Sequence, residues 1–304
     1  MLKNWLFDFV KKIEVIGVRL PEVKKGDDLA KLILTSLNNE GLKLEDKDII
    51  VITSKIVSKA KGYLEKVEKV TPSLKSRILA RLLGKPSQLI ELIKNRSESI
   101  VAVIKVDDII RELLIRKYSK SIKDALKLIE HDKSVILAKT SFGIIASEAG
   151  LDQSNVKPGY VSYLPPDPDL EAKEIRRKIE KITGKKVAVV ITDTEFSLTK
   201  IGSVDIAIGC SGLNPVDEEF ASMDIYGRPK FGGVDIIADE IAAAAALIMK
   251  QAAQGFPVVI VRGLEYETRD DIGIKDILLP YYIIKRRILR TIFITVLFKL
   301  FRLI

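Results

Sequence analysis

Apolar residues follow two periods along the first fifty or so positions, one typical of strands and one typical of a helix. β-Branched residues are concentrated at 13–20 and 48–54, which predicts two strands. Between them, apolar positions recur at helical spacing after Asp28 and stop before Gly41, which predicts a helix with a start and a stop signal. The chain therefore opens with a strand, a helix and a second strand.

The rest of the chain alternates between the same two patterns without a repeat or a flexible linker. In chain order, the expected elements are helices within 71–96, a strand at 100–104, a charged helical stretch at 107–133, a hairpin over 134–147, a proline-rich loop and helix over 164–184, strands at 187–192 and 203–212, an alanine-rich helix ending near Gly255 and a strand at 256–263. Hairpins mixed with helices favour the α+β class, with mixed or antiparallel sheets and packed helices, over a doubly wound parallel sheet.

Composition narrows the chemistry more than it narrows the fold. The 304 residues, of which 47% are hydrophobic, can bury one large core or two modest ones. A single cysteine, Cys210, and a single histidine, His131, exclude a zinc site built from these residue types and argue against a histidine-based catalytic triad. Any metal would be held by oxygen ligands, which indicates Mg²⁺ or Mn²⁺.

The formal net charge of +9 is concentrated at one end of the chain. Residues 281–304 contain six basic residues and no acidic residue, which leaves about +3 for all the others. The main body is therefore not basic enough to indicate contact with a phosphate backbone, and nucleic acid is not expected as a partner.

Both ends of the chain differ from the body between residues 13 and 265. The extension at 1–12 lacks a small-residue cleavage site, so we expect no signal peptide and a cytoplasmic protein. In the tail at 266–304, polar residues recur every three or four positions from Arg287, which predicts an amphipathic helix with a narrow polar stripe. Its longest uncharged run, Thr291 to Phe298, is too short to span a bilayer. Peripheral contact with an anionic membrane and packing on the body or on a partner subunit are equal alternatives.

Polar residues able to bind a metal or a phosphate lie at the ends of several expected elements. In chain order they are Lys59, Asp152, Asn155, Asp193, Thr194 and Gln251. Taken singly, each has an ordinary role available to it, as a turn residue, a helix cap or a solvated side chain. The chain has neither a G-x-x-x-x-G-K-[ST] loop nor a G-x-G-x-x-G turn, so a nucleotide would bind by other means.

A series of motifs in a fixed order extends from about Ile13 to Glu265. They read LPEVKKGDDLA, VITSKIVSKAKG, AGLDQSNV, LPPDPD, ITDT, DIAIGCSG, DIYGR, ADEIAAAAALIMKQ and FPVVIVRG. On these motifs the chain resembles the coenzyme F420-0:L-glutamate ligase family, GTP-dependent enzymes that add glutamate to the deazaflavin coenzyme F420. The resemblance is interrupted at 107–133, which looks like an insertion.

The resemblance implies ligands and a role for particular residues. It implies two Mg²⁺ or Mn²⁺ ions, K⁺ as a further ion, GTP as co-substrate, L-glutamate with F420-0 or a related carboxylate acceptor, and a homodimer. The implied catalytic residues are Asp193 and Lys200. The implied metal ligands are Asp152, Asp193, Thr194 and Gln251. The implied nucleotide-binding residues are Leu20, Pro21, Glu22, Val23, Ser54, Lys55, Lys59, Asn155, Met249 and Gly255.

The family reaction explains why such side chains are needed. An amide forms from a carboxylate only with a better leaving group than oxide, so the γ-phosphoryl group of GTP is transferred to the acceptor and the glutamate amine then displaces phosphate. In this chemistry a protein mainly positions the reactants and neutralises their charge. Carboxylate, hydroxyl and amide oxygens hold the divalent ions, and a buried strand would fix Asp193 and Thr194 in the required geometry.

The chain departs from the family pattern near the expected substrates. After the Asp-Thr pair the family reads Phe-Gly-Arg-Pro-Trp-Arg, whereas here the first arginine is Ser197 and the second has Lys200 as its only counterpart. Glu148 adds a carboxylate before the first metal aspartate, and Lys250 replaces a glycine. Loss of one charge-assisted contact costs about 1.5–3 kcal/mol. The hypothesis is therefore a ligase with a changed acceptor or efficiency. The alternative is an impaired family member that binds nucleotide or F420, or regulates, without turnover.

Overall fold

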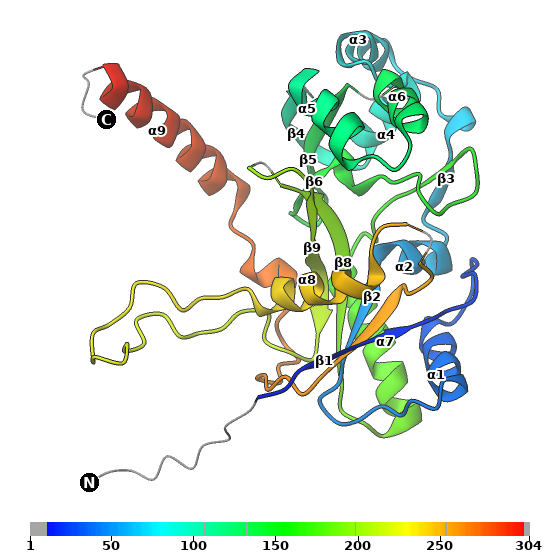
Figure 1. The fold of residues 1–304 in the computed structure, drawn as a ribbon, viewed down its shortest axis with the longest axis vertical. Helices are drawn as coiled ribbons and strands as arrows, with labels where there is room; N and C mark the ends of the chain where they lie inside the picture. Colours follow the sequence, from blue (N-terminus) through cyan, green and yellow to red (C-terminus); the bar gives the residue numbers. More distant parts are fainter. Residues whose placement is uncertain (1–10, 106–107, 132, 198, 253, 301–304) are drawn as a thin grey trace.

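The fold was obtained as a computed structural model, and the structure describes residues 11–105, 108–131, 133–197, 199–252 and 254–300. Most of the extension at 1–12 therefore lies outside the described residues. The expected α+β class is confirmed, because sheets with antiparallel and parallel pairs pack against helices. Figure 1 shows a large sheet with its helices, a smaller lobe of helices and strands, and a C-terminal helix that projects from the body.

A five-stranded mixed sheet forms the centre of the molecule. In spatial order its strands are β1 (Glu14–Val18), β10 (Val258–Arg262), β2 (Ile49–Thr53), β8 (Ala188–Phe196) and β9 (Ser203–Ser211). β2 and β8 run parallel, and the other neighbouring pairs run antiparallel. Four consecutive residues of β2 and four of β8 are fully buried, which requires cover on both faces of the sheet.

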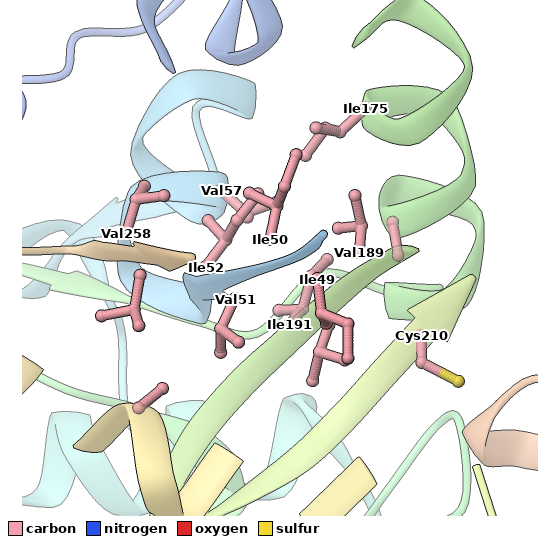
Figure 2. Packing of buried hydrophobic residues seen from close by; sticks show 14 of the residues in the cluster. Ile49, Ile50, Val51, Ile52, Val57, Ile175, Val189, Ile191, Cys210 and Val258 are labelled. Carbon is pink, nitrogen blue, oxygen red and sulfur yellow. The ribbon is translucent and has the colours of Figure 1, made fainter. Parts of the chain in front are cut away.

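Helices supply that cover. α7 (Pro168–Thr183) packs on β8 and β9, α1 (Leu29–Asn39) packs on α7, and α8 (Ile237–Met249) packs on β1, β9 and β10. Figure 2 shows Ile175 of α7 beside Ile50 and Val189 of the parallel strands. α2 (Ser54–Lys61) follows β2 with no intervening loop, so its first turn lies at the end of a buried strand.

A smaller lobe contains a three-stranded antiparallel sheet and its own core, which includes Ile90, Ile93 and Ile136. Its elements are α3 (Leu74–Leu83), α4 (Ser87–Asn95), β4 (Ser97–Lys105), α5 (Asp108–Leu113), a π-helical turn (Leu114–Tyr118), α6 (Ile122–His131), β5 (Ser134–Thr140) and β6 (Ile145–Ser147). The predicted hairpin is thus confirmed, and most described residues of the charged stretch are helical, with a break at 119–121. A ribbon of β3 (Leu64–Lys66) and β7 (Tyr160–Ser162) and short 3-10 turns at Val67–Lys69, Glu148–Gly150 and Ile274–Ile277 complete the body.

Two predicted boundaries were wrong. The strand expected at 187–192 continues to Phe196, because its backbone stays paired with β9 as far as Ser203, so the Asp-Thr pair lies within the strand rather than after it. The alanine-rich helix ends at Met249 rather than near Gly255. Lys250 ends it by adopting φ +49° and ψ −169°, a conformation that leaves the helix.

The tail divides differently from the expected boundary at residue 266. Ile274 is buried in the main core, and Ile277 and Leu278 pack against that core, so this part of the tail belongs to the body. The expected C-terminal helix is present as α9 (Tyr281–Leu300), which projects away from the body in Figure 1. Among the described residues, no helix is both long enough and apolar enough to cross a membrane.

Candidate active site

One cavity collects almost all of the residues predicted to form the site. Its volume is about 770 Å³, and it lies where β2 and β8 approach α2 and the end of α8. The predicted residues that line it are Leu20, Pro21, Glu22, Val23, Ser54, Lys55, Lys59, Asp152, Asn155, Asp193, Thr194, Met249, Gln251 and Gly255. Of the predicted set, Lys200 alone is absent from this lining. The cavity thus brings the residues together, while their chemical roles stay predictions.

The parallel pairing of β2 with β8 creates the centre of the cavity. Thr53 pairs with Thr192, so the next residue of each segment, Ser54 and Asp193, emerges beside the other. The Ser54 hydroxyl donates a hydrogen bond of 2.7 Å to the Asp193 carboxylate. In open α/β sheets, ligands bind outside the carboxyl ends of parallel strands, and the only parallel pair of the described main sheet opens into this cavity.

The surroundings of Asp193 disfavour its negative charge. Burial is the main reason that the pKa of Asp193 is raised to about 7, with the hydrogen bond from Ser54 acting in the opposite direction. The carboxylate of Glu195 raises this pKa further, and the Lys55 ammonium lowers it. The protein groups therefore leave the charge of Asp193 incompletely compensated, and a cation in the cavity would compensate it.

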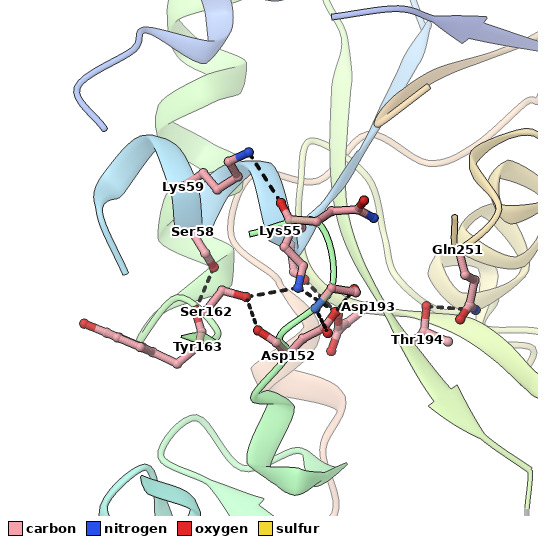
Figure 3. A network of polar contacts seen from close by, with 12 residues as sticks. Lys55, Ser58, Lys59, Asp152, Ser162, Tyr163, Asp193, Thr194 and Gln251 are labelled. Atoms are coloured by element: carbon pink, nitrogen blue, oxygen red, sulfur yellow. Dashed lines mark hydrogen bonds and ion pairs between the residues drawn. The ribbon is translucent and has the colours of Figure 1, made fainter. Parts of the chain in front are cut away.

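Asp152 is held at the opposite side of this centre by a lysine. Lys55 Nζ lies 2.5 Å from Asp152 Oδ2 and 3.0 Å from Ser162 Oγ, as Figure 3 shows. Burial alone would raise the pKa of Asp152, but Lys55 and the donors of Ser154 outweigh burial and lower it. Backbone hydrogen bonds of 3.0 and 2.9 Å between Asp152 and Ser162 fix the loop that carries the aspartate.

A hydroxyl and an amide form the other side of the centre. Thr194 donates a 2.7 Å hydrogen bond to Asp205, its partner in the β8–β9 register, and accepts one of 3.2 Å from the Gln251 amide nitrogen. Asp205 also lines the cavity and is buried, which raises its pKa. The sequence reasoning missed Asp205. One signal could have identified it. Asp205 is an acidic residue inside a predicted strand, SVDIAIG, and that strand pairs with the strand that carries Thr194.

Two lysines and a helix N-terminus give the part of the cavity beside α2 positive character. Lys55 and Lys59 lie on α2, and the first turn of α2 begins at Ser54 beside Asp193. Lys59 Nζ contacts the backbone oxygen of Asn155 at 3.5 Å and Glu22 at 3.8 Å, which ties three predicted nucleotide-binding segments together. Free N–H groups at a helix N-terminus and nearby ammonium groups are the features that bind phosphate in proteins.

The side chains in the cavity could bind a hard cation through a mixture of carboxylate, hydroxyl and amide oxygens. In the described part of the chain, no three His, Cys, Asp or Glu side chains are grouped so that they could hold a metal ion. Asp193 and Thr194 offer a carboxylate and a hydroxyl, and Gln251 would offer its amide oxygen after rotating the amide that now donates to Thr194. Asp152 would share its carboxylate with Lys55. Phosphate oxygens of a ligand would complete such a shell.

Lys250 occupies a strained position next to Gln251. Its φ of +49° with ψ of −169° is a conformation that glycine adopts readily and residues with a Cβ atom adopt at a cost of about 1–3 kcal/mol. The family glycine expected at this position is consistent with that backbone. Lys250 thus adopts this conformation, next to the Gln251 that lines the cavity, without the help of a glycine.

Of the other departures from the family pattern, Ser197 and Lys200 lie outside the cavity lining. Ser197 accepts hydrogen bonds from the backbone N–H groups of Thr199 and Lys200, so its hydroxyl shapes the β8–β9 turn, and Lys200 is exposed in that turn. Glu148, which was expected near Asp152, lines the same cavity. Its side chain bonds the buried Lys85 at 3.1 Å and the backbone N–H of Ile136 at 3.0 Å, because the smaller lobe needs that lysine neutralised.

A family model described as F420-0:Gamma-glutamyl ligase matches residues 17–263. A protein of Methanothermobacter thermautotrophicus named coenzyme F420:L-glutamate ligase is 37% identical over 270 residues, covering 88% of this chain and 96% of the relative. Proteins of the same name from Archaeoglobus fulgidus and Methanosarcina mazei are 35% identical over 254 residues and 33% identical over 266 residues. These two matches cover 83% and 87% of this chain, and 88% and 91% of the relatives.

The matched region includes the whole cavity and the five strands of the main sheet except the first three residues of β1. It also includes the charged helical stretch of the smaller lobe. The family match covers almost the same residues as the series of motifs, which extends from about Ile13 to Glu265. The chain belongs to the F420-0:gamma-glutamyl ligase family.

Proposed function

We propose that this protein is a ligase that adds L-glutamate to coenzyme F420-0, or to a related carboxylate acceptor, at the expense of GTP. Membership of the family and the names of relatives at 31–37% identity support the ligase activity. The observation that carries the proposal is the convergence of Asp152, Asp193 and Gln251, from three distant parts of the chain, on one cavity that also contains Lys55 and Lys59.

The proposed reaction has two steps. An oxygen of the acceptor carboxylate attacks the γ-phosphorus of GTP and GDP leaves, which forms an acyl phosphate. The amine of L-glutamate then attacks the acyl carbon, the C–O bond to phosphate breaks, and the amine loses a proton as the amide forms. Lys55, Lys59 and the N-terminus of α2 are placed to hold phosphate oxygens and to neutralise their charge.

Asp193, Thr194 and Gln251, with Asp152, are the residues that would hold two Mg²⁺ or Mn²⁺ ions in this reaction. When bound, the ions would supply positive charge next to the triphosphate. The protein's part is geometric, since the register of β8 with β2 and β9 fixes where the carboxylate and the hydroxyl stand. Asp205 would orient Thr194 through the hydrogen bond that it accepts from the hydroxyl.

The activity can be tested directly. We expect the protein, incubated with F420-0, GTP, L-glutamate and Mn²⁺, to convert the coenzyme to a product heavier by one glutamyl residue, as measured by mass spectrometry. Omission of GTP is the control, because the acyl phosphate cannot form without it. Glutamyl transfer that proceeds equally well without GTP would contradict the proposed mechanism.

The β8–β9 turn favours a second candidate function, a protein that binds nucleotide or F420 without turnover. Ser197 is engaged in the turn and Lys200 is exposed outside the cavity lining, so neither replaces the family arginines within the cavity. The same assay separates the two functions. Binding of GTP and Mn²⁺ in isothermal titration, together with no glutamyl product from F420-0 or other carboxylate acceptors, would favour the second.

We further propose that the protein is a homodimer, with residues 214–236 in the interface. This loop projects from the body between β9 and α8 in Figure 1 and carries apolar side chains that are almost fully exposed, Ile225 at 91% and Phe231 at 96%. Apolar side chains so exposed, in a loop held by internal hydrogen bonds such as Asp224 N to Arg228 O, are typical of an interface.

The dimer predicts a mass of twice the 33.9 kDa chain in light scattering. We expect Ile225→Asp to raise the dissociation constant at least about tenfold, because it places a charge in the apolar interface. Ile182→Asp is the matched control, since Ile182 is an exposed isoleucine on α7, away from the loop. A wild-type protein that stays monomeric at tens of micromolar, or equal effects of both variants, would contradict the proposal.

A further inference from the structure

The C-terminal helix α9 exposes a line of large apolar side chains. Tyr282, Leu289, Phe293 and Leu300 are 70%, 59%, 67% and 74% exposed. At 3.6 residues per turn these four positions fall within a sector of about 40° on the helix surface. Ile283, Ile284 and Ile294, which point to a different side of the helix, are only partly exposed. These four side chains form an apolar stripe that extends over five turns of the helix.

Every charged residue of α9 is basic. Lys285 and Arg286 lie on either side of the apolar stripe, Arg287 and Arg290 lie within the next turn, and Lys299 lies near the end, all with exposed side chains. Because long basic side chains can bend so that their charge stays in water or among headgroups while their stems cover apolar surface, this arrangement does not interrupt the stripe. No acidic residue from Tyr281 onward offsets the charge.

We propose that α9 is an interfacial anchor that lies on an anionic lipid surface, with the apolar stripe inserted between headgroups and the basic residues against lipid phosphates and carboxylates. Charge complementarity selects this occupant. Two copies of α9 packed stripe to stripe, in either direction, would bring basic residues together with no acidic partner between them, and these charges repel. The helix lies in the interface and does not cross the bilayer, in agreement with its length and charge.

The position of α9 allows this contact without disturbing the cavity. The helix begins after Leu278, whose side chain lies against the β5–β6 turn at Gly143, and its first residue, Tyr281, has the Lys139 ammonium 5.8 Å from the centre of its ring. From there α9 projects away from the body in Figure 1. A membrane-bound α9 would hold the body at the lipid surface through this short connection.

Vesicle sedimentation of the full-length protein tests the proposal. We expect the protein to pellet with vesicles of phosphatidylcholine and phosphatidylserine and to bind pure phosphatidylcholine vesicles at least about tenfold more weakly, because each basic residue near an anionic surface contributes to binding. Raising the salt concentration to 0.5 M should weaken binding to the anionic vesicles, because the attraction between charges is screened. Equal binding to both vesicle types, or none to the anionic ones, would overturn the proposal.

A matched pair of variants tests the role of the stripe. Phe293→Asp places a carboxylate in the stripe, and Thr291→Asp places the same charge two residues away on the opposite side of the helix. We expect the first to weaken vesicle binding at least about tenfold and the second by less than about threefold. Equal losses of vesicle binding by the two variants would show that the added carboxylate acts only by repulsion from the anionic lipids, and would overturn insertion of the stripe. If Phe293→Asp halves the mass in light scattering and leaves vesicle binding unchanged, α9 is a protein contact and the proposal is wrong.

Discussion

Asp193→Ala is expected to lower ligase turnover by about a thousandfold and to abolish detectable binding of GTP with Mn²⁺. The carboxylate stands at the junction of β2 and β8, bonded to Ser54 at 2.7 Å, and is the one predicted metal ligand that was also assigned a catalytic role. Its removal would leave Asp152, which already pairs with Lys55, as the only carboxylate among the four proposed ligands. Turnover is measured as glutamyl product formed per minute, and binding by isothermal titration.

Asp193→Asn separates the charge from the packing. The asparagine amide oxygen can still accept the hydrogen bond from Ser54, and the substitution removes a charge that burial disfavours. We therefore expect an activity loss close to that of the alanine variant in a protein that melts at the same temperature or higher. Asp239→Asn is the control, because Asp239 is a half-buried carboxylate outside the cavity lining that accepts a 2.9 Å bond from the Ala207 backbone N–H. Retention of wild-type turnover by Asp193→Asn would contradict the proposed role.

The order of elements could be predicted from the sequence because each depends on a local pattern. The helix cap at Asp28, whose side chain accepts from Lys31, and the left-handed glycines Gly84 and Gly184 that end α3 and α7 follow from residue type at a single position. Strands with four or more buried apolar residues were equally clear. The end of β8 was not, because it depends on pairing with β9 rather than on the apolarity of its own residues.

The same limit explains which parts of the site were missed. Thr194 faces Asp205 only because the β8–β9 register shifts after Ile191, and no property of either residue predicts such a shift. Likewise, Glu148 was expected near Asp152 and lines the same cavity, but its ion pair was not predicted. Its actual partner, Lys85, is distant in sequence and lies in the loop before α4. Contacts between distant segments depend on the tertiary structure, which local sequence patterns do not predict. The family resemblance predicted such contacts only for the residues that line the cavity.

Arg262→Ala is expected to destabilise the protein by about 3–5 kcal/mol, because it leaves a buried carboxylate without its partner. Arg262 Nε and Nη2 donate to the two oxygens of Asp48 at 2.8 and 2.7 Å, and Asp48 is 1% exposed. Arg262 also bonds Glu45 at 2.6 Å and the backbone oxygen of Lys43 at 2.8 Å. It thus joins the end of β10 to the loop that leads into β2. A fall in melting temperature of roughly 10 °C, followed by circular dichroism, would be the measurement.

A second arginine provides a control of the same geometry. Arg269 Nε and Nη2 donate to the two oxygens of Asp271 at 2.9 and 3.0 Å, but Asp271 is exposed. Because an exposed pair contributes only about 0–1 kcal/mol, Arg269→Ala should shift the melting temperature by a few degrees at most. The double variant Arg262→Met with Asp48→Leu should recover much of the stability lost in Arg262→Ala, since neither charge is then left buried. Equal falls in melting temperature for the two alanine variants would contradict this explanation. The loss of stability would then come from removing any arginine contact, and not from leaving the buried Asp48 unpaired.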